Sequence, residues 1–114
     1  MAPEARTATD MISAVPIPGP GETVSRPGWT FFTNHAHVLI ALNRDPELRQ
    51  RDISALVGIT QGAVQRILDD LEAEGYIRRE RVGRRNRYEV LPSSPLRHPL
   101  EADHTIDEIL ELLA

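Results

Sequence analysis

Apolar residues at positions 38–42 are spaced as on one side of a helix, with polar residues on either side of them. The inward positions of this helix are Val38, Leu39 and Leu42. Asn34 belongs to the residue types that cap helix N-termini, and Asp45 before Pro46 disfavours a continued helix. The pattern therefore predicts a first helix over residues 34–43.

A second, short helix is predicted to end at Gly58, because glycine readily adopts the left-handed conformation that follows many helices. Its inward positions are Ile53, Leu56 and Val57. Asp52 is placed to cap it, and residues 49–51 before the cap read as a short extended segment.

A third helix is predicted over residues 61–74, with Thr60 as its cap and Gly75 closing it. Its apolar positions follow the i, i+3, i+4, i+7 rule and are Val64, Ile67, Leu68 and Leu71. Two short helices joined by a tight glycine turn predict a helix-turn-helix.

After Gly75 the pattern changes to that of two strands around a tight turn at residues 83–86, which predicts a hairpin. Pro92 and Pro95 end the hairpin, and a short amphipathic helix is predicted over residues 105–113. The apolar stripe of that helix consists of Ile106, Ile109, Leu110 and Leu113. This stripe requires a partner, so we expect it to form a dimer interface.

The predicted fold class is α+β, mainly α: a three-helix bundle with a β-hairpin wing, plus a C-terminal amphipathic helix. Residues 29–92 form the predicted winged domain, and residues 93–114 a linker and the last helix. Residues 1–28 hold five of the nine prolines, so they are expected to be a flexible arm.

The stretch DISALVGITQGAVQRILDDLEAEGYIRRERVGRRNRYEV resembles winged helix-turn-helix transcription regulators of the multiple-antibiotic-resistance-regulator (MarR) class. The resemblance covers residues 30–92 and is carried by a threonine followed by a spaced set of residues. These are Val64, Arg66, Leu68, Leu71, Glu72, Gly75 and Tyr76. It implies a DNA-binding regulator. Larger members have long helices on both sides of the domain, and here a proline-rich arm stands in place of the N-terminal one.

Charge is unevenly distributed in this chain of net charge −4, in which all 13 basic residues are arginine. Six of them lie between Tyr76 and Arg87, against the single acid Glu80, whereas five acids and no arginine occupy the last 14 residues. A GC-rich genome is one explanation for the use of arginine in place of lysine, and the fit of arginine's planar fork to phosphates and guanine edges is the other. Such a cluster directly after a helix-turn-helix indicates the phosphate backbone of double-stranded DNA as partner.

The candidate base-contacting residues face outward from the first turns of the third helix, because in helix-turn-helix proteins these turns meet base edges in the major groove. They are Gln61, Gly62, Gln65 and Arg66. Arg66 has three alternatives: a base, a phosphate, or pairing with Asp69 or Asp70. Gly62 either admits a close backbone approach or is simply tolerated in a first turn.

The candidate backbone contacts come from the predicted wing and from the start of the third helix, since helix N-termini attract anions. They are Thr60, Arg81, Arg84, Arg85 and Arg87. Capping alone accounts equally well for Thr60, and a solvated surface is the alternative for the arginine run. The leading hypothesis is a sequence-specific regulator that acts as a homodimer.

Two further hypotheses remain open: a winged helix used as a protein-interaction module without direct DNA binding, and a regulator with an effector pocket at the dimer interface. No residues define such a pocket in the sequence. The aromatic group Trp29, Phe31 and Phe32 is expected to pack under the first helix or in a dimer interface rather than to stack on bases.

No catalytic, metal or cofactor site is predicted. The chain has no cysteine, which excludes disulfides and thiolate metal ligands. His35 and His37 would point about 200° apart on a helix, and the geometry around His98 and His104 is not predictable. No signal or membrane-spanning pattern is present, so we expect a cytoplasmic, nucleoid-associated protein of one small domain.

Overall fold

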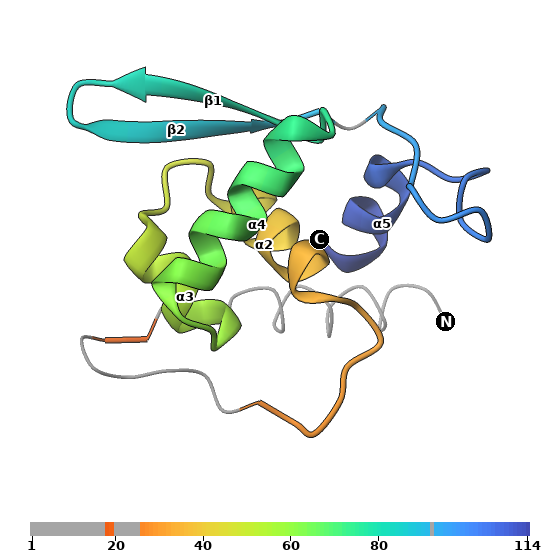
Figure 1. Ribbon diagram of the computed structural model, residues 1–114, viewed down its shortest axis with the longest axis horizontal. Coiled ribbons are helices and arrows are strands. Elements are labelled where there is room, and N and C mark those ends of the chain that lie inside the picture. Colours follow the sequence, from red (N-terminus) through yellow and green to blue (C-terminus); the bar gives the residue numbers. More distant parts are fainter. Residues whose placement is uncertain (1–17, 20–25, 92) are drawn as a thin grey trace, which may run out of the picture.

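Four helices and one antiparallel hairpin make up the part of the chain that the computed structural model describes, residues 18–19, 26–91 and 93–114 (Figure 1). The elements are α2 (Asn34–Arg44), α3 (Gln50–Val57), α4 (Gln61–Ala73), β1 (Ile77–Val82), β2 (Arg85–Val90) and α5 (Ile106–Leu113). The predicted fold class, a mainly helical α+β winged helix, is therefore confirmed. Most of the arm expected at residues 1–28 lies outside the described residues.

The N-cap of α2 is Thr33, one residue before the predicted cap, Asn34. Thr33 is the cap, in an extended conformation, and its Oγ1 accepts a hydrogen bond from the Ala36 amide at 3.4 Å. Asn34 is already helical, and its Oδ1 instead accepts from Arg26 Nη2 at 2.9 Å. Both residue types are good caps.

The prediction of a short extended segment at residues 49–51 is wrong, because α3 already begins at Gln50. Asp52 is not the cap but lies in the first turn, where its Oδ2 accepts from the Arg49 amide at 3.4 Å. The preceding loop meets the hairpin through one backbone hydrogen bond, from the Tyr88 amide to the Pro46 carbonyl at 2.9 Å.

The turn between α3 and α4 agrees with the sequence pattern. Gly58 has a φ of 83°, a left-handed conformation that other residues rarely adopt, and its amide donates to the Ser54 carbonyl at 2.9 Å. The Thr60 hydroxyl caps α4 by accepting from the Ala63 amide at 3.1 Å. The helix-turn-helix predicted from periodicity and glycine placement is present.

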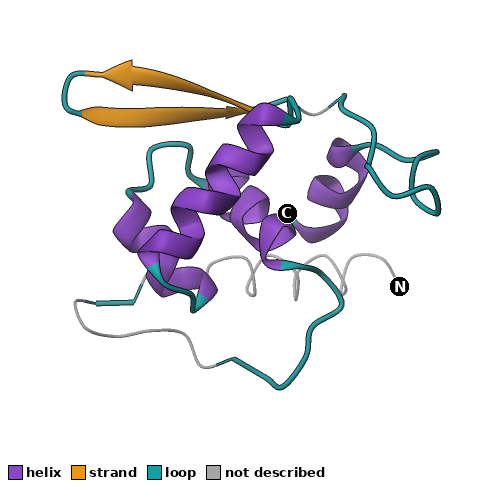
Figure 2. Cartoon of the chain, viewed as in Figure 1, coloured by secondary structure: helices purple, strands orange, loops and turns teal. Residues whose placement is uncertain are grey.

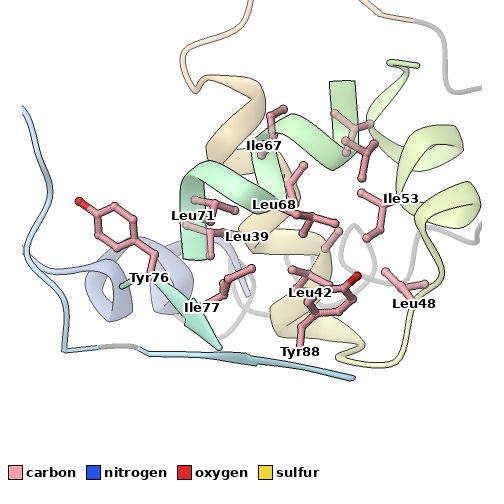
Figure 3. Packing of buried hydrophobic residues seen from close by; sticks show 14 of the residues in the cluster. Leu39, Leu42, Leu48, Ile53, Ile67, Leu68, Leu71, Tyr76, Ile77 and Tyr88 are labelled. Carbon is pink, nitrogen blue, oxygen red and sulfur yellow. The ribbon is translucent and has the colours of Figure 1, made fainter. Parts of the chain in front are cut away.

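A single hydrophobic core joins all six elements (Figure 3). Val38, Leu42, Ile53, Val64 and Leu68 are the most deeply buried, and they come from α2, α3 and α4. The hairpin contributes Ile77 and Tyr88, so one face of the wing's base is fixed to the helices. Every apolar position predicted to face inward on α4 is buried.

The hairpin has a two-residue loop, Gly83 and Arg84, shorter than the predicted turn at residues 83–86. Val82 pairs with Arg85, and the register continues to Ile77 opposite Val90. Gly83 has a φ of 63° and Arg84 a negative φ. This is the glycine-first pattern of a type II′ turn, whose twist suits a two-stranded ribbon.

The C-terminal segment returns to the domain and covers part of the predicted dimer stripe. The Tyr76 hydroxyl donates to the Pro95 carbonyl at 2.9 Å, and the Ile106 amide donates to the Ser94 carbonyl at 3.0 Å. Helix α5 packs against α2, which buries Ile106 and Leu110 in the chain's own core. The stripe therefore finds its partner partly within the chain, and only Ile109 and Leu113 remain half-exposed.

The longest described helix is α4, with 13 residues. A helix needs about 20 apolar residues to cross a bilayer, and none of those in the described part of the chain is long and apolar enough.

Candidate nucleic-acid interface

The first two turns of α4 present polar side chains outside the core. Gln61, Gly62 and Arg66 are exposed, whereas Gln65 is half-buried. A Cβ added to Gly62 would meet only the Thr60 hydroxyl, at 4.0 Å, so nothing within the described protein requires glycine there. The backbone of this turn is open to a partner from outside.

Gln65 differs from the other candidates because its carboxamide is already engaged. Its Oε1 accepts from Gln50 Nε2 at 2.5 Å, and its Nε2 donates to Asp69 Oδ1 at 2.9 Å. Gln50 lies in the first turn of α3. The candidate base-reading side chain is thus held between the two helices of the helix-turn-helix.

The acidic residues in the second half of α4 and at its C-cap contact basic side chains from three other parts of the chain. Asp69 Oδ1 and Glu72 Oε1 lie 3.2 and 3.4 Å from Arg79 Nη2 on β1. The other two pairs are His35 Nε2 with Asp70 Oδ2 at 2.9 Å and Arg97 Nε with Glu74 Oε1 at 3.5 Å. These acids tie the helix to the wing, to α2 and to the C-terminal segment, rather than facing a polyanion.

Because Asp69 and Asp70 are occupied in this way, neither pairs with Arg66. Arg66 is exposed, and among the described residues it has no ion pair or side-chain hydrogen bond. The pairing alternative is therefore absent from the structure, and the base and phosphate alternatives remain.

The arginines of the hairpin divide into a paired base and an unpaired tip. At the base, Arg78 Nη2 lies 2.8 Å from Glu89 Oε1, and Arg79 binds the acids of α4. Towards the tip, Arg84 and Arg87 have no ion pair or side-chain hydrogen bond within the described residues. Glu80 lies opposite Arg87 in the register, but among the described residues no carboxylate forms an ion pair with either arginine.

The remaining two wing arginines donate to backbone carbonyl oxygens rather than to carboxylates. Arg81 Nε donates to the Gly83 carbonyl at 3.1 Å, within the turn. Arg85 Nη2 donates to the Glu47 carbonyl at 2.6 Å, in the loop before α3. Arg85 therefore links the wing to the helix-turn-helix, a role that the sequence did not indicate.

The four candidate wing arginines do not form one row. In the register, Arg81 lies on the same face as the core residues Ile77 and Tyr88, whereas Arg85 and Arg87 lie on the opposite face. Arg84 occupies the turn itself. Together they surround the tip with positive charge instead of lining one side of the ribbon.

The hairpin tip and the N-terminal half of α4 lie at the same end of the molecule's longest axis, which is horizontal in Figure 2. Helix α5 and the loop before it lie towards the opposite end (Figure 1). The N-terminal half of α4 and the hairpin tip thus share one end of the protein.

The aromatic residues before α2 are not all in the core, contrary to one of the two expectations for them. Trp29 is 73% exposed and Phe31 90% exposed, and their rings meet edge to face with centroids 5.1 Å apart. Only Phe32 is half-buried. The pair leaves a large apolar surface exposed outside the arginine-rich hairpin.

A cavity of about 340 Å³ opens beside these rings, which the sequence did not indicate. Its walls come from the start of α2, the second half of α4, the loop before α5 and α5 itself, and they are largely apolar. The His35–Asp70 and Arg97–Glu74 pairs contribute to its lining.

Three of the four histidines, His35, His98 and His104, form hydrogen bonds with protein groups. His104 Nδ1 lies 2.8 Å from Glu108 Oε2, and this hydrogen bond raises the pKa of His104 and lowers that of Glu108. Burial, together with Arg26, lowers the pKa of His37. Within the described residues, no group of three or more histidine and carboxylate side chains could hold a metal ion.

Three residues that organise this end of the molecule were missed in the sequence: Gln50, Asp69 and Arg79. Gln50 was assigned to an extended segment, and Asp69 was considered as a possible partner of Arg66. A signal existed for Arg79, because it lies two residues after the buried Ile77 and therefore on the same face of the strand.

Comparison with known proteins agrees with this geometry. Residues 32–87 match the sequence model of the MarR family. The match spans α2 to the middle of β2, so it includes the helix-turn-helix and the wing tip. No curated protein sequence matches the chain. Members of the MarR family are DNA-binding transcription regulators rather than enzymes.

Proposed function

We propose that the protein, whose winged helix-turn-helix belongs to the MarR family, is a sequence-specific regulator that binds double-stranded DNA as a homodimer. The observation that carries this proposal is the set of uncompensated arginines at the hairpin tip, at the same end as the exposed start of α4. The acids of α4 weaken this proposal less than their number indicates, because Arg79 and Arg97 offset part of their charge within the protein.

In this proposal the start of α4 enters the major groove. Gln61, Gly62, Gln65 and Arg66 are the candidates for base contacts, since glutamine recognises adenine and arginine recognises guanine through two atoms each. Arg66 is the best placed for guanine or phosphate, because no acid in the described structure holds it. The helix terminus at Thr60 offers its amides to a phosphate.

The wing supplies the sequence-independent part of the affinity. Arg81, Arg84, Arg85 and Arg87 are the candidates for contacts with the phosphate backbone or the minor groove. Arg84 and Arg87 are free to move to DNA. Arg85 must exchange its bond to the Glu47 carbonyl for a phosphate, a stronger acceptor because it carries a charge.

The dimer surface is proposed on the side of α5. Of the expected stripe, Ile106 and Leu110 support the fold, and Ile109 and Leu113 are the parts that a second copy can reach. Leu112, which is 71% exposed, extends that surface. Two recognition helices related by two-fold symmetry would read a palindrome with half-sites about one helical turn apart.

The test is selection of bound sequences from a random DNA pool, with the mass of the protein measured in the same preparation. The proposal predicts an enriched palindrome and a dimeric mass. A monomer that enriches no sequence would contradict it. We place the protein with the chromosome in the cytoplasm, as DNA binding requires.

One second function is favoured by a specific observation. The exposed Trp29–Phe31 pair is the kind of aromatic surface that protein interfaces use, and it supports a protein-interaction module without DNA binding. Pull-downs that survive nuclease treatment, together with no mobility shift on genomic fragments, would favour that alternative. The cavity beside the pair would suit the effector-sensing variant of the regulator.

A further inference from the structure

A chain of side-chain hydrogen bonds connects the three elements of the candidate interface. It starts at Gln50 on α3, passes through Gln65 and Asp69 on α4, and ends at Arg79 on β1. The donor–acceptor distances along it are 2.5, 2.9 and 3.2 Å. Gln65 is the only member of this chain among the candidate base contacts.

Asp69 determines which way the Gln65 carboxamide points. An ionised carboxylate can only accept hydrogen bonds, so the atom of Gln65 that faces it must be the donor Nε2. Turning the amide over would place Oε1 against the carboxylate, so that two acceptors faced each other and this hydrogen bond was lost. The amide therefore has one favoured orientation.

The oriented amide keeps unused capacity for a base. A carboxamide has two N–H donors and two lone pairs on its oxygen. The bonds to Gln50 and Asp69 use one of each, which leaves one donor and one acceptor. Adenine presents one acceptor and one donor in the major groove, so the remaining pair is what its recognition needs.

Arg79 in turn holds Asp69 in place. Its Nη2 contacts both Asp69 and Glu72, and its guanidinium lies 5.9 Å from the centroid of the Tyr88 ring. The side chain is only 20% exposed, and its buried Nε has no hydrogen-bond partner within the described part of the chain. Arg79 therefore belongs to the junction between the wing and α4 and is poorly placed to meet a phosphate itself.

We propose that Asp69, held by Arg79, is a positioning residue that sets the base preference of Gln65 without touching DNA. This inference rests on the proposed function, and it assigns a specificity role to an acid on the recognition helix. It also makes Gln50 part of the device, because Gln50 supplies the donor at the other end of the amide.

The test is sequence selection with four variants. Gln65→Ala identifies the base position that Gln65 reads. Asp69→Asn should relax preference at that position by roughly tenfold, because asparagine can donate or accept and no longer fixes the amide. Gln50→Glu should relax the same position, because its carboxylate would attract Nε2 away from Asp69. Asp70→Asn is the matched control: it removes the same charge one residue away without touching Gln65.

Two readouts separate a positioning role from a merely structural one. The dependence of binding on salt should be the same in Asp69→Asn and Asp70→Asn, since neither removes a phosphate contact. Thermal unfolding shows whether Asp69→Asn folds. If it does not, Gln50→Glu tests the inference instead, because that substitution lies on another helix.

Wild-type preference retained in Asp69→Asn and Gln50→Glu would overturn the inference and leave the proposed function standing. Equal loss of preference at every position in these variants would overturn it too, as a general structural effect. A wild-type protein that selects no sequence would overturn both the inference and the proposed function.

Discussion

Gly62 is exposed in the first turn of α4 and has open space where a side chain would be. We predict that Gly62→Ala raises the free energy of unfolding by up to about 1 kcal/mol, because alanine is the better helix former. If DNA approaches the backbone there, the same change weakens DNA binding. Chemical denaturation and a binding titration measure the two effects. A more stable variant with unchanged affinity would mean that glycine is only tolerated at this position.

His37 should make the fold sensitive to mild acid. Burial lowers its pKa below the ordinary value of 6.5, and Arg26 lowers it further. Below pH 6.5 the unfolded chain therefore takes up a proton that the folded protein resists, so stability falls as the pH decreases towards the folded pKa. Denaturation at pH 7.5 and 5.5 should show this loss in the wild type and a smaller one in His37→Gln.

The pKa of His104 is shifted in the opposite direction, so this histidine serves as the control for His37. Its bond to Glu108 raises its pKa, so it contributes stability below pH 6.5 that is lost as the pH rises through the folded value. The same bond lowers the pKa of Glu108, so Glu108 contributes its stability fully above its ordinary pKa of 4.5. The pair therefore stabilises the fold most between pH 4.5 and pH 6.5, the ordinary pKa values of the two groups. Both side chains are exposed, so the effect is small. His104→Ala should therefore increase, not reduce, the loss of stability on acidification.

At the scale of elements, α5 is held to the domain by its buried side. We predict that Leu110→Ala lowers the free energy of unfolding by about 2–5 kcal/mol, because it leaves a cavity in the core. Leu112→Ala removes the same atoms from a position that is 71% exposed and should change the stability little. Equal effects of the two substitutions would contradict the packing of α5 against α2.

The elements differ in how far the sequence determines them. α4 was predicted almost to the residue, because Thr60, a strict apolar period and Gly75 all indicate the same helix. Residues 49–51 were assigned wrongly, because three consecutive charged or polar residues show no hydrophobic periodicity that would predict a helix. The contact of the preceding loop with the hairpin, through the Pro46 carbonyl, is likewise a tertiary contact that the local sequence does not show. Local pattern cannot reveal which chain segment lies beside another.

The candidate site shows the same division. Exposure of Gln61 and Arg66 followed from helical periodicity, and the arginine cluster was visible in the sequence. The bonds between Gln50, Gln65 and Asp69 could not be foreseen, since they depend on the angle between α3 and α4. The number of stripe residues available for a dimer was overestimated, because Ile106 and Leu110 are buried within the chain itself. The apolar face of a short helix does not indicate whether it packs against its own chain or against a second copy.

At the scale of the whole molecule, the account requires two copies. Ile109→Ser together with Leu113→Ser should convert the dimer to a monomer, because these residues are the half-exposed part of the α5 stripe. Sedimentation measures the mass, and circular dichroism checks that the fold is kept. Trp29→Ser with Phe31→Ser is the comparison on the exposed aromatic pair. A dimer that survives the α5 change but not the aromatic change would move the interface to the aromatic surface.

If the arginine tip neutralises DNA phosphates, DNA binding must weaken steeply as the salt concentration rises. With about four phosphate contacts in each subunit, the logarithm of the binding constant should fall with that of the salt concentration at a slope of about −7. Arg84→Ala with Arg85→Ala should make the slope about 3 to 4 units shallower, at roughly 0.9 per lost contact. Arg78→Ala, whose charge is balanced by Glu89, should leave it nearly unchanged. A double variant with the wild-type slope would contradict the account.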